Sequence, residues 1–209
     1  MRVCSVIGVV GLSLAASGAS GSMLVTNGSF EDVQLAGPTR VAISNLEDWT
    51  ASGGFMLLEQ GVNGTSNTAA HSGTQFVSMG HNAATGDTLS QVLATTPGVE
   101  YDVSFFTISI QGVAAQEIEA SVFDASPARG PGGPLASATA DVDVTNNVWA
   151  ETSFRFTAVS ELSELRFVHT VGGSGPNMAI DTVSVSVVPA PGLLTCMGVA
   201  GLLGTRRRR

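Results

Sequence analysis

The chain has 209 residues, with 17 acidic residues against nine arginines and no lysine, and only 6% of it is aromatic. All 17 acidic residues but only four of the arginines lie between residues 23 and 188, so this part carries a formal charge of −13. Such a surface repels the phosphates of nucleic acids and of anionic lipids, which argues against a nucleic-acid-binding role. The part is long enough for one domain with its own hydrophobic core.

The first 22 residues have the layout of a secretory signal peptide. Arg2 supplies a positive charge, the segment 3–16 is almost continuously apolar, and small residues occupy positions 17–22. This order of regions is typical of signals that are removed on export. The apolar segment is shorter than the ~20 residues that a membrane span needs. We therefore expect cleavage, and an uncleaved N-terminal anchor is the alternative.

The cysteines indicate how the exported domain is stabilised. Cys4 lies in the signal segment and Cys196 near the end of the chain, so the part between residues 23 and 188 has none. An extracellular domain without disulfides depends on its hydrophobic core, on a bound metal, or on both.

Alternation of apolar and polar residues indicates β-strands throughout the middle of the chain. In the segment 99–110 the apolar positions change parity between Phe105 and Phe106. This change predicts either a bulge or a strand that is covered on both faces. The same alternation marks the segments 118–122, 153–156, 165–167 and 183–187. About ten or eleven such short strands predict an all-β domain, either a two-sheet β-sandwich or a jelly roll.

Three motifs in this domain carry a family resemblance. They are Asn27-Gly28-Ser29-Phe30-Glu31, then Ser90-Gln91 followed by Thr95-Thr96-Pro97-Gly98 and Tyr101, and finally Ile180-Asp181-Thr182-Val183. Their order resembles the choice-of-anchor C proteins and their relatives among plant cell-wall proteins of unknown function. The resemblance implies a galactose-binding-like jelly roll, akin to many carbohydrate-binding modules. We assign residues 23–188 to this domain.

Asp181 is the first candidate for a functional side chain. It has the strand parity of Val183 and Val185, which we expect to face the core, and a buried carboxylate is costly unless it is paired or coordinated. In sugar-binding jelly rolls that this domain resembles, the first and last strands meet at a structural calcium ion, which implies Glu31 as a second ligand. Calcium takes six to eight oxygen ligands. We therefore predict calcium at Glu31 and Asp181, near the segment 71–73, unless a bulge turns Asp181 outward to cap a turn.

The other candidate residues favour structural roles. Trp49 and Trp149 could stack on sugars, but the low aromatic content favours places in the core. His71, His81 and His169 have no metal-ligand spacing. The segment 86–90 weakly resembles an esterase nucleophile motif but leads into a strand rather than a helix. Glu117 and Glu119 share one face of one strand, whereas glycosidase carboxylates face each other across a cleft.

The end of the chain carries a tripartite pattern. The apolar segment Gly192–Gly204 would be roughly 20 Å long as a helix, which is short against a bilayer core of about 30 Å. The pattern resembles the PEP-CTERM sorting signal, a Pro-Glu-Pro motif, an apolar transmembrane helix and a basic cluster that an exosortase recognises, with alanine here in place of the glutamate. A plain C-terminal anchor is the alternative. The residues of this motif are Pro189, Ala190, Pro191, Arg206, Arg207, Arg208 and Arg209.

These features together predict an exported protein that is not an enzyme. Its domain 23–188 is expected to bind carbohydrate at the cell surface or in the extracellular matrix, after transient anchoring at the inner membrane through residues 189–209. The partners implied are an envelope or extracellular polysaccharide and an exosortase-like enzyme. A structural component of an exopolysaccharide matrix without a specific ligand is the alternative, and a secreted hydrolase is a third possibility with little support.

Overall fold

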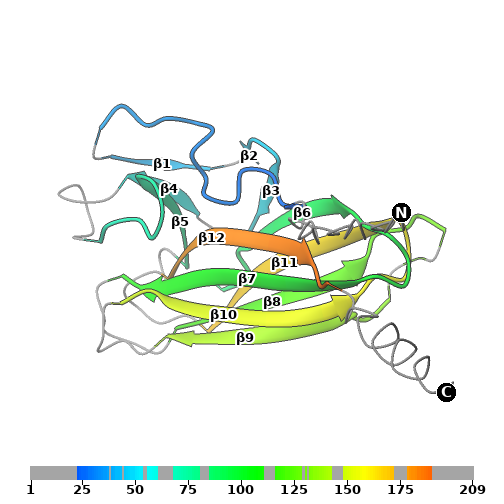
Figure 1. Cartoon of the computed structure of the whole chain (residues 1–209). Helices are drawn as coiled ribbons and strands as arrows, with labels where there is room; N and C mark the ends of the chain where they lie inside the picture. The colour runs from blue at the N-terminus through cyan, green and yellow to red at the C-terminus, as the bar shows by residue number, and fades with distance from the viewer. Residues whose placement is uncertain are drawn as a thin grey trace, which may run out of the picture.

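The chain forms two antiparallel sheets that pack face to face, as the computed structural model in Figure 1 shows. The structure describes residues 23–37, 39–43, 45–53, 56–60, 68–80, 85–110, 116–128, 130, 132–142, 148–171 and 178–189. The predicted signal peptide lies outside this range, as does the predicted sorting tail after Pro189. Within the described part, no helix is long and apolar enough to cross a membrane.

Each sheet has six strands. Sheet A has the order β1 (Arg40–Ala42), β4 (Leu57–Gln60), β5 (Gln75–Met79), β12 (Met178–Val187), β7 (Glu100–Ser109) and β10 (Ala150–Thr157). Sheet B has the order β2 (Asn45–Leu46), β3 (Trp49–Ser52), β6 (Thr88–Ala94), β11 (Leu162–Val171), β8 (Gln116–Asp124) and β9 (Ala136–Val142). This arrangement confirms the predicted all-β sandwich.

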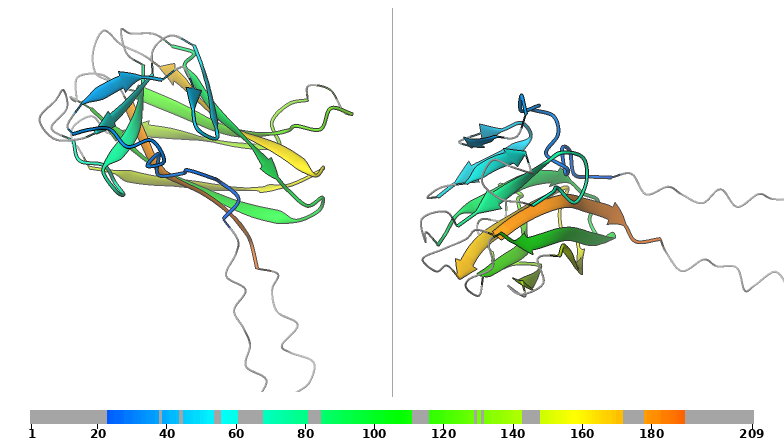
Figure 2. Two further views of the ribbon diagram at one scale, coloured as in Figure 1. Left: turned by 90° about the horizontal axis from the view of Figure 1, so that it is seen from above. Right: turned by 90° about the vertical axis from the view of Figure 1, so that its left-hand side faces the viewer.

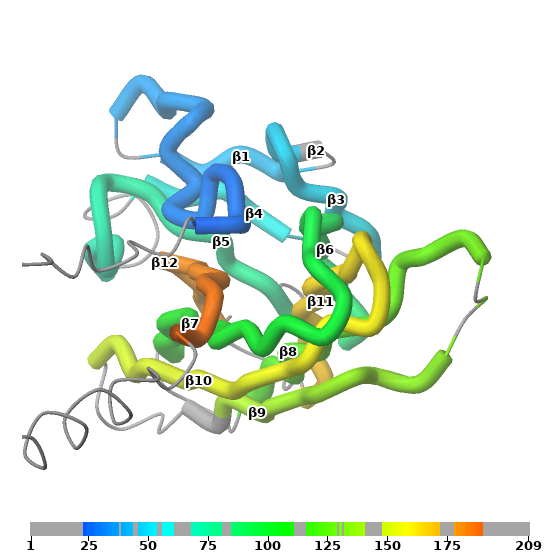
Figure 3. Tube along the Cα trace, turned by 45° about the vertical axis from the view of Figure 1, so that its right-hand side comes forward, coloured from blue at the N-terminus to red at the C-terminus, as the bar shows by residue number. Residues whose placement is uncertain are grey.

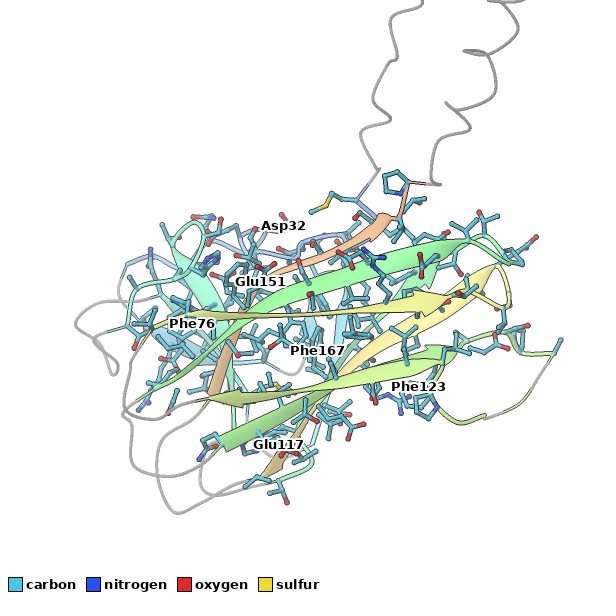
Figure 4. The ribbon with its side chains drawn as sticks, turned by 60° about the horizontal axis from the view of Figure 1, so that its bottom comes forward. Asp32, Phe76, Glu117, Phe123, Glu151 and Phe167 are labelled. Carbon is cyan, nitrogen blue, oxygen red and sulfur yellow. The ribbon has the colours of Figure 1, made fainter. Side chains whose placement is uncertain are left out.

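The hydrophobic core fills the space between the two sheets. Its centre holds Phe167 of β11, which packs edge-on against Phe105 of β7 and lies 6.2 Å from Trp49 of β3, between ring centroids. Trp49 is 3% exposed and also contacts Phe30, so the prediction that Trp49 fills the sandwich is confirmed. Figure 4 shows Phe167 between the sheets.

Strand β7 is covered on both faces, which explains the change of parity in its sequence. Phe105 belongs to the core between the sheets, whereas Ile108 belongs to a second, smaller apolar cluster on the outer face of sheet A. Its pairing with β10 runs without a break from Thr107 to Glu100. The second of the two expectations for this segment is therefore the correct one.

A segment ahead of the first strand completes sheet A. β5 pairs with β12 only along Met178–Ile180. Beyond that point the N-terminal arm, residues 24–35, takes its place, because Leu24 N–H donates to the Val185 carbonyl and Val183 N–H donates to the Gly28 carbonyl. Gly28 has to be glycine here, since a Cβ would overlap the Val183 carbonyl oxygen. Figure 3 shows the arm in blue beside β12.

Two buried glutamine side chains bind backbone groups of this arm that do not bond to β12. Gln91 Oε1 accepts from Thr26 N–H, and Gln91 Nε2 donates to the carbonyls of Thr26 and Asp48. Gln75 does the same farther along, with the Leu35 N–H and the carbonyls of Phe30 and Val33. Each side chain thus satisfies three backbone groups that would otherwise be buried without partners.

The two ends of the described chain lie at one pole of the sandwich (Figure 2). Val188 N–H donates to the Glu100 carbonyl, and Leu24 bonds to Val185 on the same strand. We call this the terminal pole, formed by residues 23–24, the turn 95–99 and residues 187–188. The opposite end, where β7 ends and β10 begins, is the distal pole.

We predict that Gln91→Leu lowers the free energy of unfolding by about 2–4 kcal/mol, because three backbone groups lose their partner while the side-chain volume is nearly kept. Urea denaturation at constant pH measures the change. The neighbouring Val92, which is 60% exposed, provides the control, since Val92→Thr should change the stability by less than about 0.5 kcal/mol. Equal effects at the two positions would contradict the bracing role of Gln91.

Candidate functional site

A bulge in β12 places Asp181 on the outer face of sheet A. The pairing with β7 shifts register between Asp181 and Ser184, and Thr182 has a φ of 52°, a left-handed value that is strained for a β-branched residue. The expectation that Asp181 shares the core-facing side of Val183 is therefore wrong, because the count of alternating residues is interrupted within the strand. The alternative, a bulge that turns Asp181 outward, is present.

Asp181 is nevertheless completely buried, because the segment 71–75 covers it. Its Oδ2 accepts from Ser72 N–H at 2.9 Å and its Oδ1 from Thr182 N–H at 2.6 Å. Burial raises the pKa of the carboxyl group from 3.8 to about 6. The backbone donors of Ser72, Thr182 and His71 lower the pKa, and the charge of Glu31 raises it.

Glu31, on the N-terminal arm, binds the other end of the same segment. Its Oε1 accepts from the N–H groups of Thr74 and Gln75, both at 2.7 Å, and its Oε2 accepts from Thr74 Oγ1 at 2.9 Å. Gly73 has a φ of +66°, and a Cβ there would overlap the Glu31 carboxylate. A glycine is therefore required where the segment passes over the carboxylate.

The structure brings the two predicted metal ligands to one segment and gives both of them protein partners. A carboxylate offers about four lone-pair positions, and Glu31 uses four of them when the 3.3 Å bond from Gln34 Nε2 is included. A calcium ion between Glu31 and Asp181 would have to displace some of these donors. The described residues contain no group of three or more His, Cys, Asp or Glu side chains placed to hold a metal. Calcium stays a prediction.

An aromatic cluster lies beside Asp181 on the outer face of sheet A. The His71 ring stacks on Phe106 with the centroids 3.6 Å apart and the planes 15° from parallel. Trp149 meets His71 and Phe76 edge-on, each at 6.0 Å between centroids. His71 Nδ1 is 2.8 Å from Thr182 Oγ1, so the bulge also orients the imidazole. We call Phe76, Phe106, Trp149 and His71 the aromatic cluster.

Trp149 belongs to this cluster and does not lie in the core between the sheets, so the prediction of a core position for Trp149 is wrong. It is half-buried, and its Nε1 donates to the Ala69 carbonyl at 3.0 Å. It packs on the apolar residues of the smaller cluster, with Phe76, Ile108 and Ala179. Trp149 directly precedes β10 and lies over the outer face of sheet A.

The strand register extends the site into rows of polar residues. Asp181, Phe106 and Glu151 lie side by side on β12, β7 and β10. The next outward-facing rows toward the terminal pole are Ser184, Ser104 and Ser153, then Ser186, Asp102 and Arg155. Figure 4 shows Glu151 on this outer side of the sandwich and Glu117 and Phe123 on the other.

The remaining sequence candidates lie elsewhere. Glu117 and Glu119 are on the outer face of sheet B, bonded to Thr170 Oγ1 at 2.5 Å and Ser121 Oγ at 3.0 Å. They are therefore on the opposite sheet from the aromatic cluster and share one strand face, as predicted.

His169 and Asp87 belong to a buried polar cluster between the sheets. His169 Nε2 is 2.7 Å from Gln116 Oε1, and Asp87 Oδ2 accepts from Gly80 N–H at 2.9 Å. The segment 86–90 is thus a turn that enters β6, as expected from its sequence. His81 lies outside the described residues.

The aromatic cluster is not predicted by the sequence. The apolar parity of Phe106 and Ile108 was the one available signal, because it required a cover on the outer face of β7. This parity does not predict that His71 stacks on Phe106, because His71 is 35 residues away in the sequence and reaches Phe106 only through the fold.

Comparison with known proteins assigns a family. The family model described as "Protein of unknown function (DUF642)" matches residues 23–186. No curated protein matches the chain.

Solved structures share the fold at low identity. The chain is similar to a Stig cyclase, Fisc, from Fischerella sp. TAU in complex with an indole derivative (14% identity, TM-score 0.65, 82% of this chain and 100% of that chain). It is also similar to the CBM22-1 xylan-binding domain of Paenibacillus barcinonensis Xyn10C (17%, 0.52, 81% and 97%) and to a CBM4 structure (16%, 0.50, 78% and 99%). These likenesses support the predicted jelly-roll β-sandwich fold.

We predict that Asp181 makes stability depend on pH. Because its pKa is raised in the folded state, the native protein binds the proton more tightly than the unfolded chain, so this contribution is present below about pH 4 and is lost as the pH rises through about 6. In EDTA, the stability of the wild type relative to Asp181→Asn should fall by on the order of 2–3 kcal/mol between pH 4 and pH 7. Urea denaturation at both pH values measures this difference, and a constant difference would contradict it.

Proposed function

The chain belongs to the DUF642 family, and we propose that this member is an exported polysaccharide-binding protein without catalytic activity. The observation that carries the proposal is the exposed His71 ring, stacked flat on Phe106 at the outer face of sheet A and bordered by hydroxyl and carboxylate groups. The similarity of the fold to that of carbohydrate-binding modules supports it.

The chemistry of this face suits a sugar ring. A pyranose has apolar C–H faces and hydroxyl groups around its edge, so it binds best where a flat π-surface adjoins hydrogen-bonding groups. His71 and Trp149 supply the π-surface. Thr182, Ser184 and Glu151 supply hydroxyl and carboxylate groups at its border.

The non-catalytic part of the proposal rests on where the acidic residues lie. Glu31 and Asp181 both accept backbone N–H groups of the segment 71–75, so they serve to hold that segment. Glu117 and Glu119 are on the other sheet. Asp181 and Glu31 therefore have a structural role, and Glu151 is left as a group that can bind sugar hydroxyls.

Export and surface sorting are the sequence-derived part of the proposal. A signal peptide over residues 1–22 and a PEP-CTERM-like tail from Pro189 would send the domain 23–188 to the cell surface or the extracellular matrix, by way of an exosortase-like enzyme. The choice-of-anchor C resemblance of the domain agrees with this destination. Fractionation of the natural host, with mass spectrometry of both mature ends, tests the processing.

We predict that at least one polysaccharide retards the wild-type domain in affinity electrophoresis and that His71→Ala weakens this binding about three- to tenfold, the loss typical of one aromatic stacking contact. Phe123→Ala is the matched control, because Phe123 is an aromatic residue on the outer face of sheet B, under Arg166. Melting curves establish that both variants fold. If no polysaccharide of a broad panel retards the protein, a structural matrix component without a specific ligand is the better interpretation.

We also propose a structural calcium ion at Glu31 and Asp181, which belongs to the predicted binding module. Calcium at 100 times its Kd would then stabilise the fold by about 2.7 kcal/mol, and Asp181→Asn should remove most of this gain. Thermal unfolding at pH 7.5 with calcium chloride or with EDTA measures it. Equal melting temperatures in the two buffers would contradict the calcium proposal and leave the hydrogen-bond donors of the protein as the partners of these carboxylates.

A further inference from the structure

We propose that this site selects an uncharged glycan chain, bound along β7, and rejects glycans that carry carboxylate or sulfate groups. The inference rests on the proposed function and adds the class of ligand. It depends on the distribution of charge and hydroxyl groups over the outer face of β12, β7 and β10.

The site is extended along β7. From Phe106 to Asp102 the strand advances about 13 Å, and outward-facing polar residues accompany it on both neighbouring strands. The middle row consists of Ser184, Ser104 and Ser153, and the Oγ atoms of Ser104 and Ser184 lie 2.9 Å apart. Serine hydroxyls both donate and accept, as glycan hydroxyls do. A chain of sugar units that stacks on His71 would continue over this row.

Carboxylates dominate the charge of this face. Glu151 lies beside Phe106, and Asp102 and Glu100 follow on β7 toward the terminal pole. On the described residues of these three strands, the positive charge comes from Arg155. Its guanidinium group is paired with Asp102 at 3.3 Å and with Glu100 at 4.0 Å. An anionic glycan would thus meet acidic side chains without a free cation to receive it.

Among the described residues, two further basic side chains face the outer side of sheet A. Arg40 is on the edge strand β1, in the row with Glu59, four strands and roughly 19 Å from β7. At physiological ionic strength the Debye length is ≈ 8 Å, so Arg40 does not offset the charge at Phe106. The other is His71, whose Nδ1 lies 2.8 Å from Thr182 Oγ1.

Glu151 also favours uncharged glycans directly. It is exposed and stands beside Phe106 in the register of β10, whereas Asp181 on the other side of Phe106 is buried and accepts backbone N–H groups. An exposed carboxylate accepts hydrogen bonds from sugar hydroxyls, and such charge-assisted bonds are stronger than neutral ones. Uncharged glycans can therefore use the same group that repels charged ones.

The test compares polymers that share a backbone and differ in charge. Affinity electrophoresis at pH 7.5 in EDTA would use hydroxyethyl cellulose against carboxymethyl cellulose, and starch against carboxymethyl starch. EDTA prevents calcium from bridging acidic groups. For each backbone that binds, we expect the uncharged polymer to bind at least about tenfold more tightly than the carboxymethylated one, which corresponds to about 1.4 kcal/mol.

Charge-reversal variants locate the effect. Glu151→Lys should reduce the preference for the uncharged polymer to less than about threefold, mainly because the carboxymethylated polymer gains affinity. Glu117→Lys makes the same change of net charge on the outer face of sheet B and should leave the preference as it is. Ser104→Ala should weaken binding of the uncharged polymer about fivefold, and Ser137→Ala on sheet B should not.

The outcomes separate the two proposals. Equal or tighter binding of the carboxymethylated polymer would overturn the charge selection while polysaccharide binding stands. Equal effects of Glu151→Lys and Glu117→Lys would overturn it too, since they would indicate net charge and not this face. Absence of binding by all four polymers, together with no retardation in the broader panel, would overturn polysaccharide binding itself.

Discussion

The structure depends on a change of partner along β12. The strand pairs with β5 over its first three residues and with the N-terminal arm afterwards, and the bulge at Asp181–Ser184 marks the change. The segment 71–75, which leads into β5, brings backbone N–H groups to this junction. The carboxylates of Asp181 and Glu31 accept them from the last strand and from the arm. Three stretches that are distant in sequence are thereby joined by charge-assisted hydrogen bonds.

The same junction determines where the aromatic cluster lies. Asp181 accepts the N–H group of Ser72, and Thr182 Oγ1 contacts the ring of His71. The two consecutive residues of the bulge therefore position the imidazole. Phe106 is the register partner of Asp181 on β7, which explains why His71 stacks on that ring. A strained φ at Thr182 fits a position where the surrounding structure, and not local preference, sets the backbone.

Local patterns in the sequence predict the strands and the buried face of most of them, because alternation survives wherever a strand is regular. The change of parity in β7 predicted either a bulge or the double cover that is present, and the low aromatic content favoured the core for Trp49, correctly, and for Trp149, wrongly. The orientation of Asp181 does not follow from such patterns, since one inserted residue reverses parity and nothing adjacent in sequence marks it. The roles of Gln75 and Gln91 are not predicted for another reason. Their partners lie about 40 or more residues away, and a polar residue in a strand pattern is normally assigned to the solvent-facing side.

The neighbouring positions of residues 24 and 185 have a consequence for how the domain can be joined to other chains. A module whose ends meet can be inserted into a surface loop of a host protein, or strung on a flexible linker, without opening its sheets. A partner fused to either end is attached at the terminal pole, six residues of β7 or roughly 20 Å from Phe106. Steric shielding of the aromatic face by a fusion partner, a support bead or a lipid surface is thereby minimised.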